Sequence, residues 1–147
     1  MVPGIAFTRK WADDDIARLV IRVSDGISLF VNEAYVPLEW GACAAADLQT
    51  FSRHIHGGLF NLHVGEGGPE YAGGAFHARF HYSAPHALMI STWQQGDYFP
   101  FKGREVAAKA KMYLQTEPAL LDRFVAALPT LDASESGQVL LECIAVG

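Results

Sequence analysis

Strict alternation of apolar and polar side chains over residues 75–83 (AFHARFHYS) constrains the fold more than any other feature of this chain. Successive side chains of a β-strand point to opposite faces, so one face of this segment is apolar and the other is polar. The polar face carries His77, Arg79 and His81. A strand of this kind belongs to an antiparallel sheet that buries one face and exposes the other.

Other segments share this strand character. Residues 17–24 alternate, Asp25-Gly26 is a hairpin signal, and residues 27–36 continue as a partner strand. Residues 59–64, 87–95 and 138–146 are predicted as further strands, and the turn 84–86 joins two of them. Residues 65–74 are a glycine-rich hairpin loop, and residues 96–101 bend the chain.

Residues 103–115 are the ambiguous segment. Their composition is typical of a helix, yet Val106, Met112 and Leu114 fall at even positions opposite polar residues at odd ones. Burial of one face carries more free energy than propensity does, so the period predicts a strand. A helix remains the alternative.

Two segments have helical spacing. In residues 44–56 the apolar side chains recur every three or four residues, and Gly57-Gly58 ends the helix. A second helix follows Thr116 and ends at Pro129. These elements predict a single α+β domain over residues 1–147, with a core over roughly 17–146. We expect one mostly antiparallel sheet in the order ββ-α-ββββ-α-β, with both helices on one face.

Composition narrows the functional classes. The net charge of −5 argues against nucleic acid and favours a cationic protein partner. No apolar run approaches the roughly 18 residues that a membrane-spanning helix needs. Arg9 and Lys10 follow the first apolar stretch, whereas a signal peptide begins with its charges, so we do not expect a secreted protein.

Candidate reaction centres are weak. His54 and His56 point about 200° apart on a helix, and His77 and His81 lie about 13 Å apart along a strand, so neither pair holds a metal. An HxH pair stays open if the helix frays. Cys43 precedes a helix but has alanine neighbours; it and Cys143 are expected to be reduced, with a disulfide as the alternative. The glycine-rich loop lacks phosphate-binding spacing. No cofactor is predicted.

Aromatic residues crowd residues 71–101, and several fall in predicted loops with acidic neighbours. Aromatic side chains in loops either contact a protein partner or cap an edge of the core, and the row of His77, Arg79 and His81 is either a binding surface or a solvated face. The predicted partner-binding set combines these residues with the polar strand face: Glu66, Glu70, Tyr71, His77, Arg79, His81, Asp97, Tyr98 and Phe99.

The layout resembles the WapI-like immunity proteins of bacterial polymorphic toxin systems. The resemblance spans residues 17–128: a hairpin (LVIRVSDGISLFV), a helix (DLQTFSRHI), glycine-punctuated strands (GGAFHARFHY, ALMISTWQQ) and a closing helix (LLDRFVAAL). It includes no invariant motif, so no residue role is carried over. It implies a cytoplasmic, non-enzymatic protein that binds and neutralises a toxin.

The sequence therefore predicts an immunity-type binding protein. Two alternatives stay open: a small metal-dependent or small-molecule enzyme that uses the histidines of residues 54–86, and a structural homo-oligomer, such as a homodimer, whose loop aromatics bury against a second copy.

Overall fold

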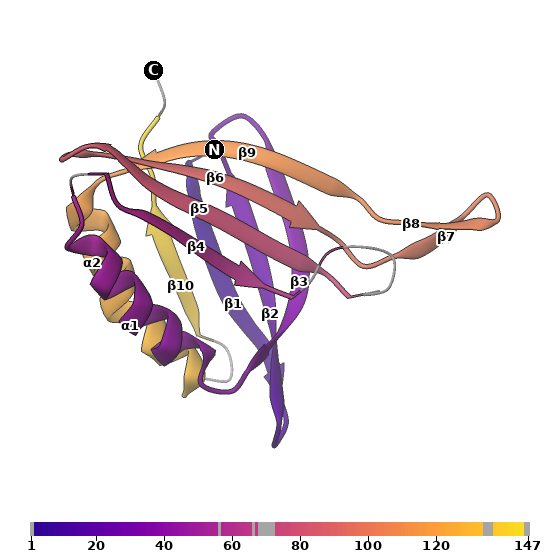
Figure 1. Cartoon of the computed structure of the whole chain (residues 1–147). Coiled ribbons are helices and arrows are strands. Elements are labelled where there is room, and N and C mark those ends of the chain that lie inside the picture. Colours follow the sequence, from indigo (N-terminus) through magenta and orange to yellow (C-terminus); the bar gives the residue numbers. More distant parts are fainter. Residues whose placement is uncertain (1, 56, 66, 68–72, 134–136, 146–147) are drawn as a thin grey trace.

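The structure, a computed structural model, describes residues 2–55, 57–65, 67, 73–133 and 137–145. It contains two four-stranded antiparallel sheets and a small two-stranded one (Figure 1). The first sheet has the order β10-β1-β2-β3, with strands Gln138–Glu142, Gly4–Ala12, Ile16–Ser24 and Leu29–Pro37. The second has the order β4-β5-β6-β9, with strands Leu59–Val64, Ala75–Ala84, Ala87–Gln95 and Lys109–Thr116.

The predicted hairpins form because their turns satisfy the backbone locally. Between β2 and β3, the Asp25 carboxylate accepts the amides of Ile27 and Ser28 at 2.9 and 2.7 Å, and Gly26 has a φ of 96°. The small sheet is a hairpin of β7 (Phe99–Phe101) and β8 (Arg104–Val106). Lys102 and Gly103 both have positive φ at its turn, as a two-residue hairpin turn with the favoured twist requires.

The α+β class and the antiparallel pairing are confirmed, but the prediction of a single sheet is wrong. The strand order also differs, because β1 was not predicted and β7 replaces part of a predicted bend. The final strand β10 returns to pair with β1, with Ile5 opposite Leu141, and so completes the first sheet. Most of residues 103–115 forms strands, as the alternation predicts: Arg104–Val106 is β8 and Lys109–Thr116 is β9, while Gly103 lies in the turn before β8.

The helices lie beside both sheets, whereas the sequence placed them on one face of one sheet. Helix α1 (Trp40–Ser52) contacts α2 (Pro118–Ala127), the 3-10 helix η1 (Leu128–Asp132) and β4, while α2 also contacts β10. Figure 1 shows the pair closing one side of the space between the sheets. The start of α1 is capped from far along the chain, because the Asp132 carboxylate accepts the amides of Gly41 and Ala42 at 2.8 Å each.

One hydrophobic cluster fills the space between the sheets and the helices. Phe7 lies near its centre, with ring centroids of Phe76, Phe124 and Trp40 5.3–6.0 Å away. These rings come from β1, β5, α2 and α1, so the aromatic cluster joins both sheets and both helices. The apolar side of β5, with Phe76, Ala78, Phe80 and Tyr82, is buried as the alternation predicts.

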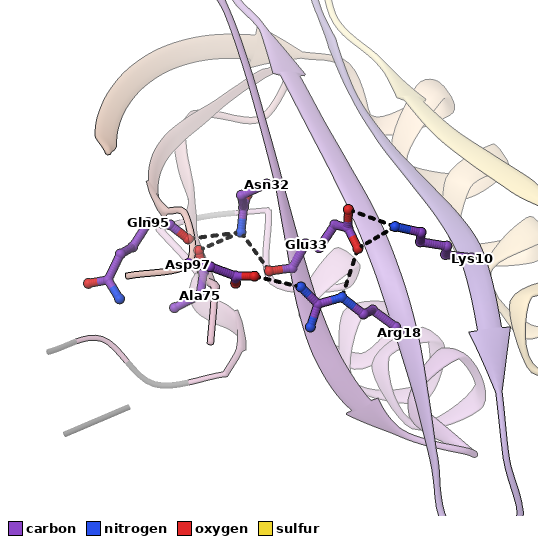
Figure 2. Close-up of polar contacts among 7 residues, drawn as sticks. All are labelled: Lys10, Arg18, Asn32, Glu33, Ala75, Gln95 and Asp97. Atoms are coloured by element: carbon purple, nitrogen blue, oxygen red, sulfur yellow. Dashed lines mark hydrogen bonds and ion pairs between the residues drawn. The ribbon is translucent and has the colours of Figure 1, made fainter. Parts of the chain in front are cut away.

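Hydrogen bonds from a polar side chain connect β3 to the adjacent ends of β5 and β6 (Figure 2). The buried Asn32 amide donates to the backbone oxygens of Ala75 and Gln95 at 3.1 Å each, and its oxygen accepts from Gln94 at 2.9 Å. These hydrogen bonds link β3 of the first sheet to the ends of β5 and β6 in the second sheet.

Candidate functional site

The outer face of the second sheet is the candidate site. Antiparallel register places its outward side chains in three rows that run across β4, β5, β6 and β9. The rows are His63–His77–Trp93–Lys111, then Asn61–Arg79–Ser91–Tyr113, then Leu59–His81–Met89–Gln115. None of these side chains is fully buried. We call these three rows the outer platform.

Charge on the outer platform contrasts with the whole chain. The rows contain Arg79, Lys111 and three imidazoles but no Asp or Glu. Lys109 follows on β9, opposite Gln95. Against 16 acidic and 11 basic residues in the chain, an acid-free platform is a local reversal of charge. Such a surface attracts anionic groups at short range, whatever the net charge.

A shallow, open hollow of about 260 Å³ lies at the centre of the platform, lined by His77, Arg79, Ser91, Trp93 and Tyr113 among others. Tyr113 is 67% exposed and Trp93 is half-buried. Exposed aromatic rings beside Arg and Lys are typical of the anchors of protein interfaces. The hollow is open, and its described lining combines cationic and aromatic side chains.

His77 lies close to two side chains of β4. Its Nε2 lies 3.2 Å from Oδ1 of Asn61, and its ring centroid lies 6.1 Å from that of His63. Burial lowers the pKa of His77 below its usual range, and the charges of His63 and Arg79 lower it further. Its neutral form is therefore favoured near pH 7.

The structure divides the predicted partner-binding set. His77, Arg79 and His81 point outward together from β5, as the alternation predicts. Asp97 and Tyr98 follow β6, and Phe99 begins β7, where it is 47% exposed. Glu66, Glu70 and Tyr71 lie outside the described residues. His56 lies outside them too, so the HxH pair has no structural description.

Asp97 belongs to a charged chain that joins the two large sheets (Figure 2). Arg18 on β2 donates to Glu33 at 2.7 Å and to Asp97 at 2.9 Å, and Lys10 lies 3.1 Å from both Glu33 carboxylate oxygens. The Arg18 hydrogen bond lowers the pKa of Glu33, assisted by Lys10 and opposed by burial. The guanidinium of Arg18 also lies 4.5 Å from the Tyr35 ring centroid. The Asp97 carboxylate is therefore paired with Arg18 of the same chain.

Sequence reasoning missed most of the platform. His63, Trp93, Lys111 and Tyr113 were not selected, because each takes its neighbours from a different strand. The sequence does contain part of this information, because pairing β5 with β6 about their short turn places His77 opposite Trp93. The loop between β4 and β5 is longer, so the sequence does not fix the register of that pair in the same way.

No family model matches the chain, and comparisons with curated proteins and with solved structures found no match. The site must be judged on its own chemistry. Among the described residues, no three His, Cys, Asp or Glu side chains gather closely enough to hold a metal ion. No described helix is long and apolar enough to cross a membrane.

The two cysteines do not pair. Cys43 is exposed on α1 and Cys143 is buried next to the end of β10. Burial raises the pKa of the Cys143 thiol to about 12, with a small opposing contribution from Thr116. A thiol of that pKa is protonated and unreactive near neutral pH.

Proposed function

We propose that this protein is a non-enzymatic binding protein of the immunity type, which neutralises a bacterial toxin by docking on it through the outer platform. The observation that carries the proposal is the acid-free, cationic and aromatic surface formed by four adjacent strands. A rigid sheet presents such side chains at a fixed spacing, so little conformational entropy is lost on docking. The immunity role itself comes from the resemblance in layout.

The charges and aromatic rings of the outer platform indicate what kind of surface on the toxin would complement it. Arg79 and Lys111 stand in adjacent rows; Trp93 lies beside Lys111, and Tyr113 lies in the same row as Arg79. A complementary surface carries carboxylates around an apolar centre. We therefore propose an acidic docking patch on the toxin, in place of the cationic partner that the net charge of −5 predicts. Net charge influences long-range approach, whereas local charge decides the contact.

Charge reversal tests this proposal. The chain is co-expressed with the product of the adjacent gene, the proposed toxin, and survival of the host cells is measured. We expect Arg79→Glu with Lys111→Glu to abolish protection and to weaken complex formation at least 100-fold, which is about 2.7 kcal/mol. Both side chains are exposed, so the thermal stability of the variant should stay close to that of the wild type.

The matched control is Arg123→Glu, an exposed reversal on α2, outside both large sheets. It changes the net charge in the same direction but leaves the outer platform intact, so protection should persist. Equal loss of protection in both variants would show that net charge alone matters. Full protection by the double variant would refute the platform as the docking surface.

A further inference from the structure

The two imidazoles at one end of the outer platform form an arrangement that docking does not require. Antiparallel register places His63 on β4 directly opposite His77 on β5, and their ring centroids are 6.1 Å apart. Both point away from the core, since Leu62, Val64, Phe76 and Ala78 beside them in sequence are buried. Directly opposed side chains on antiparallel strands are the closest pairs a sheet offers.

The spacing suits a shared metal ion. Imidazole nitrogen binds first-row metals at about 2.0–2.1 Å, which places the centroids of two rings on one ion about 5 Å apart. The observed 6.1 Å differs by a distance that side-chain rotation closes, because His63 is exposed and its ring is free of the core. By contrast, His81 lies opposite Leu59 and has no imidazole across the strand pair.

A neighbouring amide prepares His77 as a ligand. With the Oδ1 of Asn61 3.2 Å from Nε2, this nitrogen carries the proton and donates it to the amide oxygen. Nδ1 then keeps its lone pair. Metal-binding histidines usually donate their other ring N–H to an oxygen in this way, which fixes the tautomer and the ring orientation.

We propose that His63 and His77 form a two-imidazole chelate for a divalent transition-metal ion, with Cu²⁺ bound more tightly than Ni²⁺ or Zn²⁺. Two neutral nitrogen ligands select these ions over Mg²⁺ and Ca²⁺, which require oxygen. In the isolated protein, water completes the coordination. The chelate is independent of the proposed immunity function.

The fluorescence of Trp93 can report metal binding at this pair. It lies directly opposite His77 on β6, so a Cu²⁺ ion held by the pair quenches its fluorescence. The metal-free full-length protein is titrated with CuCl₂ by fluorescence and by calorimetry. We expect one ion per chain, no response to MgCl₂, and loss of the quenching, but not of the binding heat, in Trp93→Phe. The other tryptophans lie elsewhere, Trp40 against Phe7 and Trp11 against Tyr35.

Three variants decide the result. His63→Ala and His77→Ala should each weaken Cu²⁺ binding at least tenfold, because each removes half of the protein ligands. His81→Ala, on the same strand and face, should bind as the wild type does. Unchanged binding in His63→Ala, or no stoichiometric binding by the wild type, would overturn the proposal. His63 is exposed, so its variant stays folded and interpretable even if His77→Ala does not.

Failure of the chelate and failure of the docking proposal remain distinguishable. The titration uses the isolated protein and concerns two histidines, whereas the protection assay reverses Arg79 and Lys111. Loss of copper binding in His63→Ala with full protection from toxin would leave both proposals standing as separate properties of one face.

Discussion

The buried amide of Asn32 should contribute about 3 kcal/mol to the free energy of unfolding. Replacement with alanine removes its two hydrogen bonds to the backbone oxygens of Ala75 and Gln95 (Figure 2). It also removes the hydrogen bond that the Asn32 side-chain oxygen accepts from Gln94. Each buried hydrogen bond is worth about 1 kcal/mol net. Asn32 is 5% exposed and Gln94 is fully buried, so water does not replace the lost partners.

Urea unfolding followed by tryptophan fluorescence measures this loss. With a slope of about 2 kcal/mol per M, Asn32→Ala should lower the unfolding midpoint by about 1.5 M. The matched control is Asn61→Ala, at the other asparagine of the chain, which is exposed and should change stability by less than about 0.5 kcal/mol. A similarly small loss of unfolding free energy in Asn32→Ala would refute the view that the hydrogen bonds of this amide stabilise the contact between the two sheets.

Asn32→Asp adds a pH signature to the same test. The new carboxyl would face the oxygens that now accept from the Asn32 amide, so its ionised form is destabilised and its folded pKa is raised above about 3.9. A group with a raised folded pKa stabilises the protein below the unfolded pKa and loses that contribution as the pH rises. The free energy of unfolding of Asn32→Asp should therefore fall further below that of the wild type as the pH rises from 4 to 7.

Three further predictions concern groups outside this contact. Glu33 has a lowered pKa, chiefly because it accepts a hydrogen bond from Arg18. Its ionised form therefore stabilises the fold fully above the unfolded pKa of about 4.3, and this stabilisation is lost as the pH falls through the folded pKa. Glu33→Gln should flatten the acid limb of a stability–pH curve measured by urea unfolding. Asp132→Ala should cost about 1–2 kcal/mol by calorimetry, because the first turn of α1 loses its cap. At pH 8 a thiol reagent should titrate Cys43 alone in the native protein and Cys143 only after unfolding.

Local patterns in the sequence predicted the elements whose partners are close in the chain. The hairpin at Asp25-Gly26, the buried side of residues 75–83 and the stripe of Leu121 and Phe124 are all found in the structure. The period also favoured strand over helix for residues 103–115, against composition. In each case a short turn or a repeat within about ten residues holds the relevant information.

Assembly of the elements into two sheets could not be predicted in the same way. Helix α1 separates β3 from β4, and no local rule decides whether strands on either side of a helix share a sheet. Strand β1 was overlooked because Arg9 and Lys10 interrupt its alternation, at the point where its register with β2 shifts. Its pairing with β10 joins the two ends of the chain, a contact that depends on the closed core.

The two outer faces of the molecule differ in chemistry, which limits how it can bind a partner. On the first sheet, Leu29, Val31, Tyr35 and Leu140 are 43–48% exposed and present apolar surface. On the second, the outer platform combines cations, imidazoles and aromatic rings with no carboxylate. Desolvating Arg79 and Lys111 is favourable only against anionic groups, because unpaired buried charge is costly. Under the proposed function, Arg79 and Lys111 would therefore orient an acidic patch of the toxin on the second sheet.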